Sequence, residues 1–237
     1  VLCIKEKTMS VRLLLPTYVF ERNLLDTNLP EDRGLSQQYM EQLVRECNAM
    51  RRKDPVGRQL SNQYTGWQSN DGCESHPAFQ PLIKRIERTF YDEVWPFHGL
   101  DETECQMDVG NMWLNINDKG AWNAPHLHPG CWYSGVFYIR ADGDEGDISF
   151  IDKDIKVVQD CPMHPRTRQE VNYTPVSGEL ILFPSGTMHM VKPNPTDKDR
   201  YSVSFNMRVF NRMEGSHDNW NPDEFSFNLD PNGNPIF

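Results

Sequence analysis

The chain has 237 residues, 38% of them hydrophobic and 11% aromatic, which is enough for a sizeable core in one large or two small domains. Its 24 Lys and Arg against 34 Asp and Glu give a net charge of −10, which argues against binding of nucleic acid or an anionic membrane through bulk charge. No apolar run approaches the roughly 20 residues that span a bilayer.

The six cysteines are widely spaced and form no C-x-x-C pair, so we expect reduced thiols and a cytoplasmic protein. The N-terminal residues show no signal-peptide pattern. Met9-Ser10 resembles a natural start, which would make Val1 to Thr8 either a genuine extension or a cloning remnant.

Two helices are expected in the first hundred residues. From Ser36 to Lys53, and again from Pro81 to Val94, apolar residues recur at the three- and four-residue spacing of an amphipathic helix. Pro81 suits a first turn, where its missing N–H costs nothing. The polar, glycine-containing segment from Asp54 to Cys73 reads as a loop.

From about Gln106 the pattern changes to short β-type runs separated by Gly, Pro, Asn and Asp, which favours a sandwich or barrel. The expected strands are Gln106–Ile116, Ala124–His128, Cys131–Ile139, Asp147–Ile151, Glu170–Tyr173, Leu180–Phe183, Thr187–Val191 and Tyr201–Phe210. We therefore predict a mainly β fold with flanking helices, as one domain. Residues 1–105 would be a helical support, 106–210 the β core and 211–237 a surface tail.

The last strand alternates strictly. Its polar face holds Arg200, Ser202, Ser204, Asn206 and Arg208, and apolar residues occupy the other face. Either the polar face meets water, or it lines a hydrophilic barrel interior while the apolar face packs on the helices.

His126-Leu127-His128 is the strongest sign of chemistry. Flanking prolines Pro125 and Pro129 favour an extended segment, and alternate side chains of such a segment point the same way. Two imidazoles can then close on one metal ion, with the distant His189 as a third ligand. An Arg at the start of the next strand, Arg200, could hold an anion beside that metal.

Further motifs accompany these residues: Asn111-x-Trp113-x-Asn115, Pro125-His126-x-His128-Pro129, Ser134-Gly135-Val136-Phe137-Tyr138, Phe183-Pro184-Ser185 and Arg200-x-Ser202. Together they resemble the Fe(II)/2-oxoglutarate-dependent oxygenases of the double-stranded β-helix (jelly-roll, cupin-like) fold. The narrower resemblance, over roughly 106–210, is to a group of bacterial and phage oxygenases with little assigned biochemistry. It implies Fe(II), 2-oxoglutarate and O₂ as cofactors and co-substrates.

By this resemblance His126 and His189 are iron ligands, Arg200 anchors the co-substrate, and Ser202 is its partner. Asn115 and Tyr138 are candidate co-substrate contacts, with a structural role as the alternative for each. Arg208 is a second candidate anchor.

The family pattern carries Asp or Glu where this chain has His128. Either His128 is the third metal ligand, or it points away and a carboxylate such as Asp152 or Glu179 completes the site. A three-His site leaves the iron one charge unit more positive than the usual 2-His-1-carboxylate site.

The implied activity is hydroxylation of a C–H bond in an amino acid, peptide or small molecule, with release of succinate and CO₂. No nucleic-acid or membrane partner is expected. The alternatives are a three-His cupin dioxygenase that does not use 2-oxoglutarate, and a non-enzymatic metal-binding β-barrel. Trp113, Trp122 and Trp132 would line a substrate pocket or belong to the core. The segment from Asp152 to Gln169 would be a lid or a plain surface loop. No role is assigned to His76, His98, His164 or His217.

Overall fold

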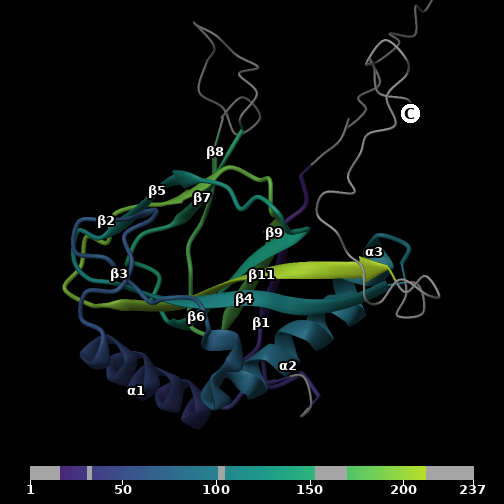
Figure 1. Cartoon of the computed structure of the whole chain (residues 1–237), viewed down its shortest axis with the longest axis horizontal. Helices are drawn as coiled ribbons and strands as arrows, with labels where there is room; N and C mark the ends of the chain where they lie inside the picture. Colours follow the sequence, from purple (N-terminus) through teal and green to yellow (C-terminus); the bar gives the residue numbers. More distant parts are fainter. Residues whose placement is uncertain (1–16, 31–33, 101–104, 153–169, 212–237) are drawn as a thin grey trace, which may run out of the picture.

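Two antiparallel sheets form the body of the molecule in the computed structural model, which describes residues 17–30, 34–100, 105–152 and 170–211. The larger sheet has the order β1 (Phe20–Asn23), β9 (Glu179–Pro184), β6 (Tyr133–Arg140), β11 (Arg200–Asn211), β4 (Cys105–Asn117), β3 (Trp67–Gln68). The smaller has the order β2 (Asn62–Gln63), β5 (Trp122–His126), β10 (His189–Val191), β7 (Ile148–Ile151), β8 (Glu170–Tyr173). In Figure 1 the larger sheet lies between the helices and the smaller sheet.

The predicted helices are confirmed, with one change at the second. Helix α1 (Gln37–Lys53) starts at Ser36, whose hydroxyl caps it by accepting from the Tyr39 N–H. Helix α2 (Gln80–Thr89) widens into a π-helical turn (Phe90–Val94) before α3 (Trp95–Phe97). Pro96 follows that turn, and a proline ring clashes with the carbonyl four residues earlier, so a widened turn before it relieves the clash. Two 3₁₀ turns, Cys73–Ser75 and Pro77–Phe79, precede α2.

The main hydrophobic core lies between the larger sheet and the helices. The apolar face of β11, which carries Tyr201, Val203, Phe205 and Met207, is buried there against residues of α1 and α2. Its polar face turns into the space between the two sheets, so the second reading of the alternating strand is confirmed. Phe205 is fully buried, and truncating such a side chain to Ala costs about 3–5 kcal/mol.

The space between the two sheets has an apolar region and a polar region. A smaller cluster, Val136, Tyr138, Ala141, Ile148, Phe150, Ile181 and Phe183, fills one part. The other part receives polar side chains from both sheets. The barrel therefore leaves a polar interior on a rigid scaffold.

Several boundaries differ from the sequence prediction. Strand β1 was not expected, and the predicted loop Asp54–Cys73 contains β2 and β3, each two residues long and so too short to show an alternation. Strand β5 ends at His126, whereas Ala124–His128 was predicted, because Pro129 follows closely and cannot donate a ladder hydrogen bond. The expected lid, apart from Asp152, the tail from 212, His164 and His217 lie outside the described residues.

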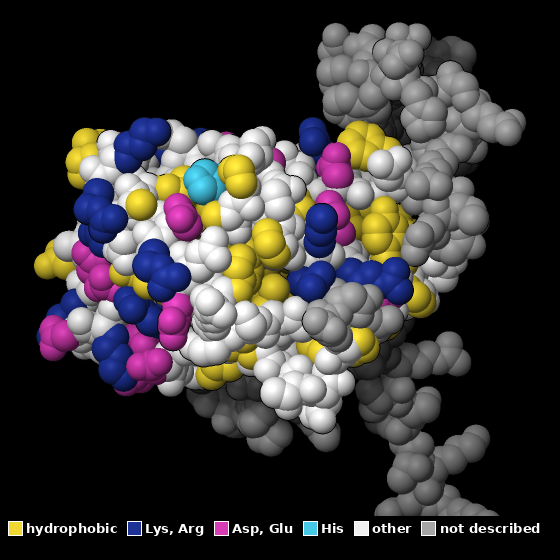
Figure 2. Space-filling model, turned by 90° about the horizontal axis from the view of Figure 1, so that it is seen from below, with side chains coloured by type: hydrophobic (Ala, Val, Ile, Leu, Met, Phe, Trp, Pro, Cys, Tyr) yellow, Lys and Arg dark blue, Asp and Glu magenta, His cyan; other side chains and the backbone are white. Residues whose placement is uncertain are grey.

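The helix side of the molecule carries charges of both signs close together, so on this face the net charge of −10 is not gathered into one acidic patch (Figure 2). Within the part of the chain that the structure describes, no helix is long and apolar enough to cross a membrane.

Candidate metal centre

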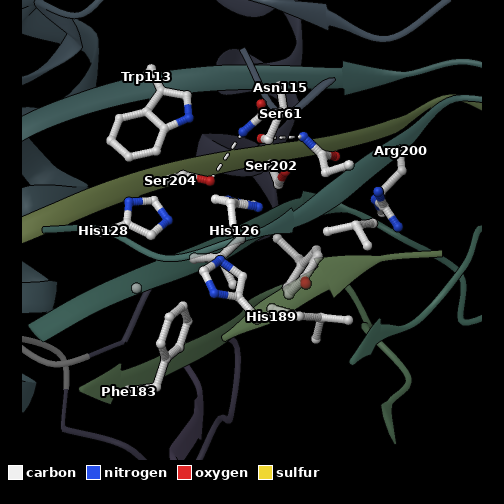
Figure 3. A pocket seen from close by; sticks show the side chains of 16 residues that line it. Ser61, Trp113, Asn115, His126, His128, Phe183, His189, Arg200, Ser202 and Ser204 are labelled. Atoms are coloured by element: carbon white, nitrogen blue, oxygen red, sulfur yellow. Dashed lines mark hydrogen bonds between the residues drawn. The ribbon is translucent and has the colours of Figure 1, made fainter. Parts of the chain in front are cut away.

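Three histidines meet between the two sheets. His126 on β5 and His189 on β10 are direct cross-strand partners, and His128 follows two residues after β5 ends. One ring nitrogen from each of the three lies within 4.8 Å of the others, which is close enough for a shared metal ion. Figure 3 shows the three rings converging in one pocket. Among the described residues, this group contains no carboxylate.

Two of the three histidines have one ring nitrogen held by a backbone carbonyl. The Nδ1 atoms of His126 and His189 lie 2.7 and 2.9 Å from the carbonyl oxygens of Ala124 and Thr187. A carbonyl only accepts, so Nδ1 carries the proton and Nε2 keeps its lone pair for a metal. Such partners orient the ligands of metal sites. For His128, the nearby Asn206 side chain opposes the lowering of its pKa by burial.

The three imidazoles are neutral near pH 7. Burial, together with the neighbouring histidines, lowers the pKa of His189 to about 3 and that of His128 to about 4. Burial also lowers the pKa of His126. Because a metal binds the neutral ring, the cluster is already in its ligating protonation state.

Aromatic rings fix the walls of the cluster. Trp113 stacks on His128 with ring centroids 5.5 Å apart and an interplanar angle of 19°. Phe183 meets His189 edge to face at 4.7 Å. These two contacts place one aromatic ring against His128 and another against His189.

Arg200 lies in the same cavity, 2% exposed. Its Nη1 donates to the carbonyl oxygens of Glu145 (3.1 Å) and Gly146 (2.6 Å), while its buried Nε has no hydrogen-bond partner. Burial lowers the pKa of Arg200. Because the ordinary pKa of an arginine is very high, the guanidinium still stays charged. A buried cation with donors left over is a strong attractor for an anion.

A row of polar side chains leads from Arg200 toward the histidines. Ser202 pairs across the sheet with Asn115 on one side and Tyr138 on the other, so all three lie on the inner face and line the cavity. Within the described residues, the Ser202 and Tyr138 hydroxyls make no hydrogen bond. The Asn115 amide contacts Ser204 Oγ at 3.0 Å, and its other atom is buried without a partner. With the amide turned over, the Ser204 hydroxyl donates to the Asn115 oxygen, and the NH₂ faces the cavity as a donor.

A second cavity of about 310 Å³ adjoins the first and shares four of its lining residues, Ser61, Trp113, His126 and His128. Most of the residues that line it are polar or charged, although Leu60, Trp113, Leu127 and Pro129 also contribute to its wall. Gln68, 3% exposed, pairs with Asn115 on the inner face of the sheet, and its side-chain amide has no hydrogen bond within the described chain. Arg58 and Asp71 form a 2.8 Å ion pair there.

The other predicted candidates lie elsewhere. Arg208 lies on the same face of β11 as Ser202 but beyond the two cavities, where it is exposed and pairs with Asp108 at 3.4 Å. Glu179 accepts from the Val176 N–H, and neither it nor Asp152 joins the histidine group. The first cavity contains Trp113, but Trp132 packs with Trp95 and Phe90 on the helix side.

Two unassigned histidines have structural contacts. His98 Nε2 lies 2.7 Å from the Tyr133 hydroxyl, and His76 Nδ1 accepts from the Ala78 N–H. Sequence reasoning missed Ser61, Gln68 and Phe183 as lining residues. Only Phe183 carried a signal, through the Phe183-Pro184-Ser185 motif.

Comparison with known proteins agrees with this geometry. Residues 111–206 match the model of a family described as "Putative 2OG-Fe(II) oxygenase", and this span contains the three histidines, Arg200 and Ser202. No curated protein sequence matches the chain.

Solved structures share the fold at low identity. A prolyl-4-hydroxylase from Pseudomonas putida superposes with a TM-score of 0.52 and 16% identity, covering 80% of this chain and 91% of that one. The epimerase SnoN from nogalamycin biosynthesis gives 0.56 and 14%, over 92% and 90%. HygX from Streptomyces hygroscopicus, crystallised with nickel, 2-oxoglutarate and hygromycin B, gives 0.51 and 10%, over 81% and 83%. Identities this low show the fold alone. Together with the family match over residues 111–206, they show that this chain has the double-stranded β-helix fold and resembles the 2OG-Fe(II) oxygenases.

Proposed function

We propose that this protein is an Fe(II)- and 2-oxoglutarate-dependent dioxygenase that hydroxylates a C–H bond of an amino acid, a peptide or another small molecule. One observation carries the proposal: three neutral imidazoles converge in a cavity whose far end holds a buried guanidinium with unused donors. A metal-chelating dianion matches both ends of such a cavity.

His126, His128 and His189 would hold the iron. Imidazole nitrogen suits iron as well as zinc, copper and nickel, and three protein ligands leave further coordination positions open. Bound iron supplies the redox chemistry by which O₂ and 2-oxoglutarate convert a substrate C–H to C–OH with release of succinate and CO₂. The protein's own part is to position the reactants and exclude water.

Arg200 and Ser202 would receive the far carboxylate of 2-oxoglutarate, with Asn115 and Tyr138 as further contacts. All four side chains can offer a proton to an anion, and none is a carboxylate that would repel it. The free volume of the cavity, about 40 Å³, is room for a few water molecules, so lining side chains must rotate when the co-substrate enters.

The substrate would occupy the adjoining 310 Å³ cavity, beside His126 and His128. Its unbonded Gln68 amide and the Arg58–Asp71 pair offer donors and acceptors without a net charge. This wall favours a polar, neutral or zwitterionic molecule over a hydrocarbon. The related structures named above include a prolyl hydroxylase and a hygromycin B complex, so amino-acyl groups and polar natural products are the classes to screen first.

The test is an anaerobic titration of the protein with Fe(II) and 2-oxoglutarate. We expect a weak visible charge-transfer band, and slow succinate release once O₂ is admitted. His189→Ala should abolish the band, whereas His98→Ala, which removes a histidine outside the cavity, should retain it. Absence of the band in the wild type, with iron bound, would refute the use of 2-oxoglutarate.

The absence of a carboxylate from the histidine group supports a second candidate. In a three-His dioxygenase that uses no 2-oxoglutarate, Arg200 would bind a carboxylate of the substrate itself. This candidate predicts iron binding, no charge-transfer band with 2-oxoglutarate, and O₂ consumption that depends on the substrate alone.

A further inference from the structure

We infer that Glu145 is a positioning residue for Arg200, the residue that binds the anion. Its carboxylate fixes the loop that holds Arg200, and its negative charge lies near the guanidinium without forming an ion pair with it. The inference rests on the proposed function, in which Arg200 binds the far carboxylate of 2-oxoglutarate. We call residues 142–147, between β6 and β7, the anchor loop.

Glu145 is one of the few carboxylates buried in the described chain, at 1% exposure. Its oxygens accept from the backbone N–H groups of Asp142 (2.9 and 3.1 Å), Gly143 (3.2 Å) and Asp144 (3.3 Å). The side chain therefore folds back onto its own loop and closes it. Hydrogen bonds from several N–H groups to one carboxylate fix the loop.

The same loop supplies the only acceptors that Arg200 has within the described chain. The carbonyl oxygens of Glu145 and Gly146 both accept from Nη1, so the orientation of the guanidinium follows the loop backbone. Gly146 has φ +95°, and a Cβ there would lie 2.5 Å from the Lys192 carbonyl oxygen. The backbone path that presents these two carbonyls is thus tightly constrained.

The charge arrangement is as specific as the hydrogen bonds. The negative charges of Glu145 and Asp147 oppose the lowering of the Arg200 pKa by burial. Yet no carboxylate makes an ion pair with Arg200 in the described residues. The carboxylate oxygens of Glu145 accept hydrogen bonds from the N–H groups of the loop. Nε and Nη2 of the guanidinium therefore stay available to an incoming anion without a competing carboxylate.

A matched control lies next in the chain. Asp144 belongs to the same loop and carries the same charge, but its carboxylate is 57% exposed and, within the described residues, its ion-pair partner is Lys198, at 3.8 Å. Asp144→Asn removes one negative charge from the loop without touching its internal bonds. Any effect of the charge alone, at long range, would therefore appear in both variants.

The experiment compares two ligands on Glu145→Gln, Glu145→Ala, Asp144→Asn and the wild type. Affinities for 2-oxoglutarate and for 2-oxovalerate, which has the same chain without the far carboxylate, are measured by anaerobic calorimetry with Mn(II) in place of iron. We expect Glu145→Ala to weaken 2-oxoglutarate about tenfold, a loss typical of one charged hydrogen bond. 2-Oxovalerate should change less than about twofold. Glu145→Gln should fall between, and Asp144→Asn should match the wild type.

A general loss of structure would weaken both ligands equally, and that result would overturn the inference. So would unchanged discrimination in Glu145→Ala. A readout that needs no ligand is amide hydrogen exchange: the N–H groups of Asp142, Gly143 and Asp144 should exchange faster in Glu145→Ala and not in Asp144→Asn. Failure of the wild type to prefer 2-oxoglutarate over 2-oxovalerate would instead count against the proposed function. The hydrogen-exchange result would still test whether the Glu145 carboxylate fixes the anchor loop.

Discussion

Replacing Arg200 by Met should separate binding from stability, because this side chain is costly to bury and useful only to a ligand. The change removes the two hydrogen bonds from Nη1 to the carbonyl oxygens of Glu145 and Gly146, worth about 1 kcal/mol each. It also removes a buried Nε without a partner, which costs about 1–3 kcal/mol, and a desolvated charge. The opposing terms nearly cancel, so the free energy of unfolding should change by less than about 1 kcal/mol.

The affinity for 2-oxoglutarate should respond very differently. A bidentate pair of charge-assisted hydrogen bonds is worth about 3 kcal/mol or more, so binding should weaken at least about 100-fold. Urea unfolding of the metal-free protein and anaerobic calorimetry with Mn(II) measure the two quantities. The control is Arg51→Met, which breaks the bidentate pair with Asp118 far from the cavity and should leave the affinity unchanged. A loss of more than about 3 kcal/mol of stability in Arg200→Met, with affinity intact, would show that Arg200 is a structural residue.

Four further results are expected. His128→Ala should weaken Fe(II) binding by about 100-fold or more, since loss of an outer-shell partner alone costs 10–100-fold; unaltered iron affinity would show that another group is the third ligand. Metal affinity should fall less than about tenfold between pH 7.5 and 5.5, because the lowered pKa values of His128 and His189 leave both rings neutral there. The same lowered pKa values make the stability of the metal-free protein depend on pH. Above pH 6.5, the ordinary histidine pKa, both rings are neutral in the folded and the unfolded chain, and the free energy of unfolding keeps its full value. As the pH falls from there toward about 4 and 3, the unfolded chain binds protons that the folded chain does not, so the free energy of unfolding should decrease, as measured by urea unfolding at several pH values. Gln68→Leu should change the free energy of unfolding by less than about 1 kcal/mol, because its amide makes no hydrogen bond within the described residues, and leave substrate-free succinate release unchanged; a loss of more than about 2 kcal/mol would indicate that Gln68 is bonded within the fold.

Local periodicity carried much of the prediction of the fold. The eight strands expected from 106 to 210 all occur, each with both ends within two residues of the prediction, since a run of alternating or β-branched residues is a property of neighbours in the chain. The helix cap at Ser36 is equally local. The short strands β2 and β3 were not predicted, because two residues cannot show a period. They form only where a longer strand is already present to pair with.

The candidate site likewise contains residues that local sequence motifs predict and residues that only the structure identifies. His126, His128, His189, Arg200 and Ser202 stood out because each sits in a motif of unusual chemistry. By contrast, Gln68 and Glu145 lie in segments with no pattern of their own. Their importance comes from the cross-strand register, which sets Gln68 beside Asn115, and from a loop that folds back on one carboxylate. Neither arrangement leaves a trace in the spacing of residues.

The amino-acid sequence determined that this protein has a polar strand face, an H-x-H segment between prolines and an arginine downstream, since these are facts of composition and order. Only the tertiary structure decided that His126 and His189 are cross-strand partners, that Arg200 is buried without a carboxylate while Arg208 faces solvent, and that the polar face looks inward. The physical reason is that register, bulges and burial arise from pairing between segments far apart in the chain, where no local preference acts.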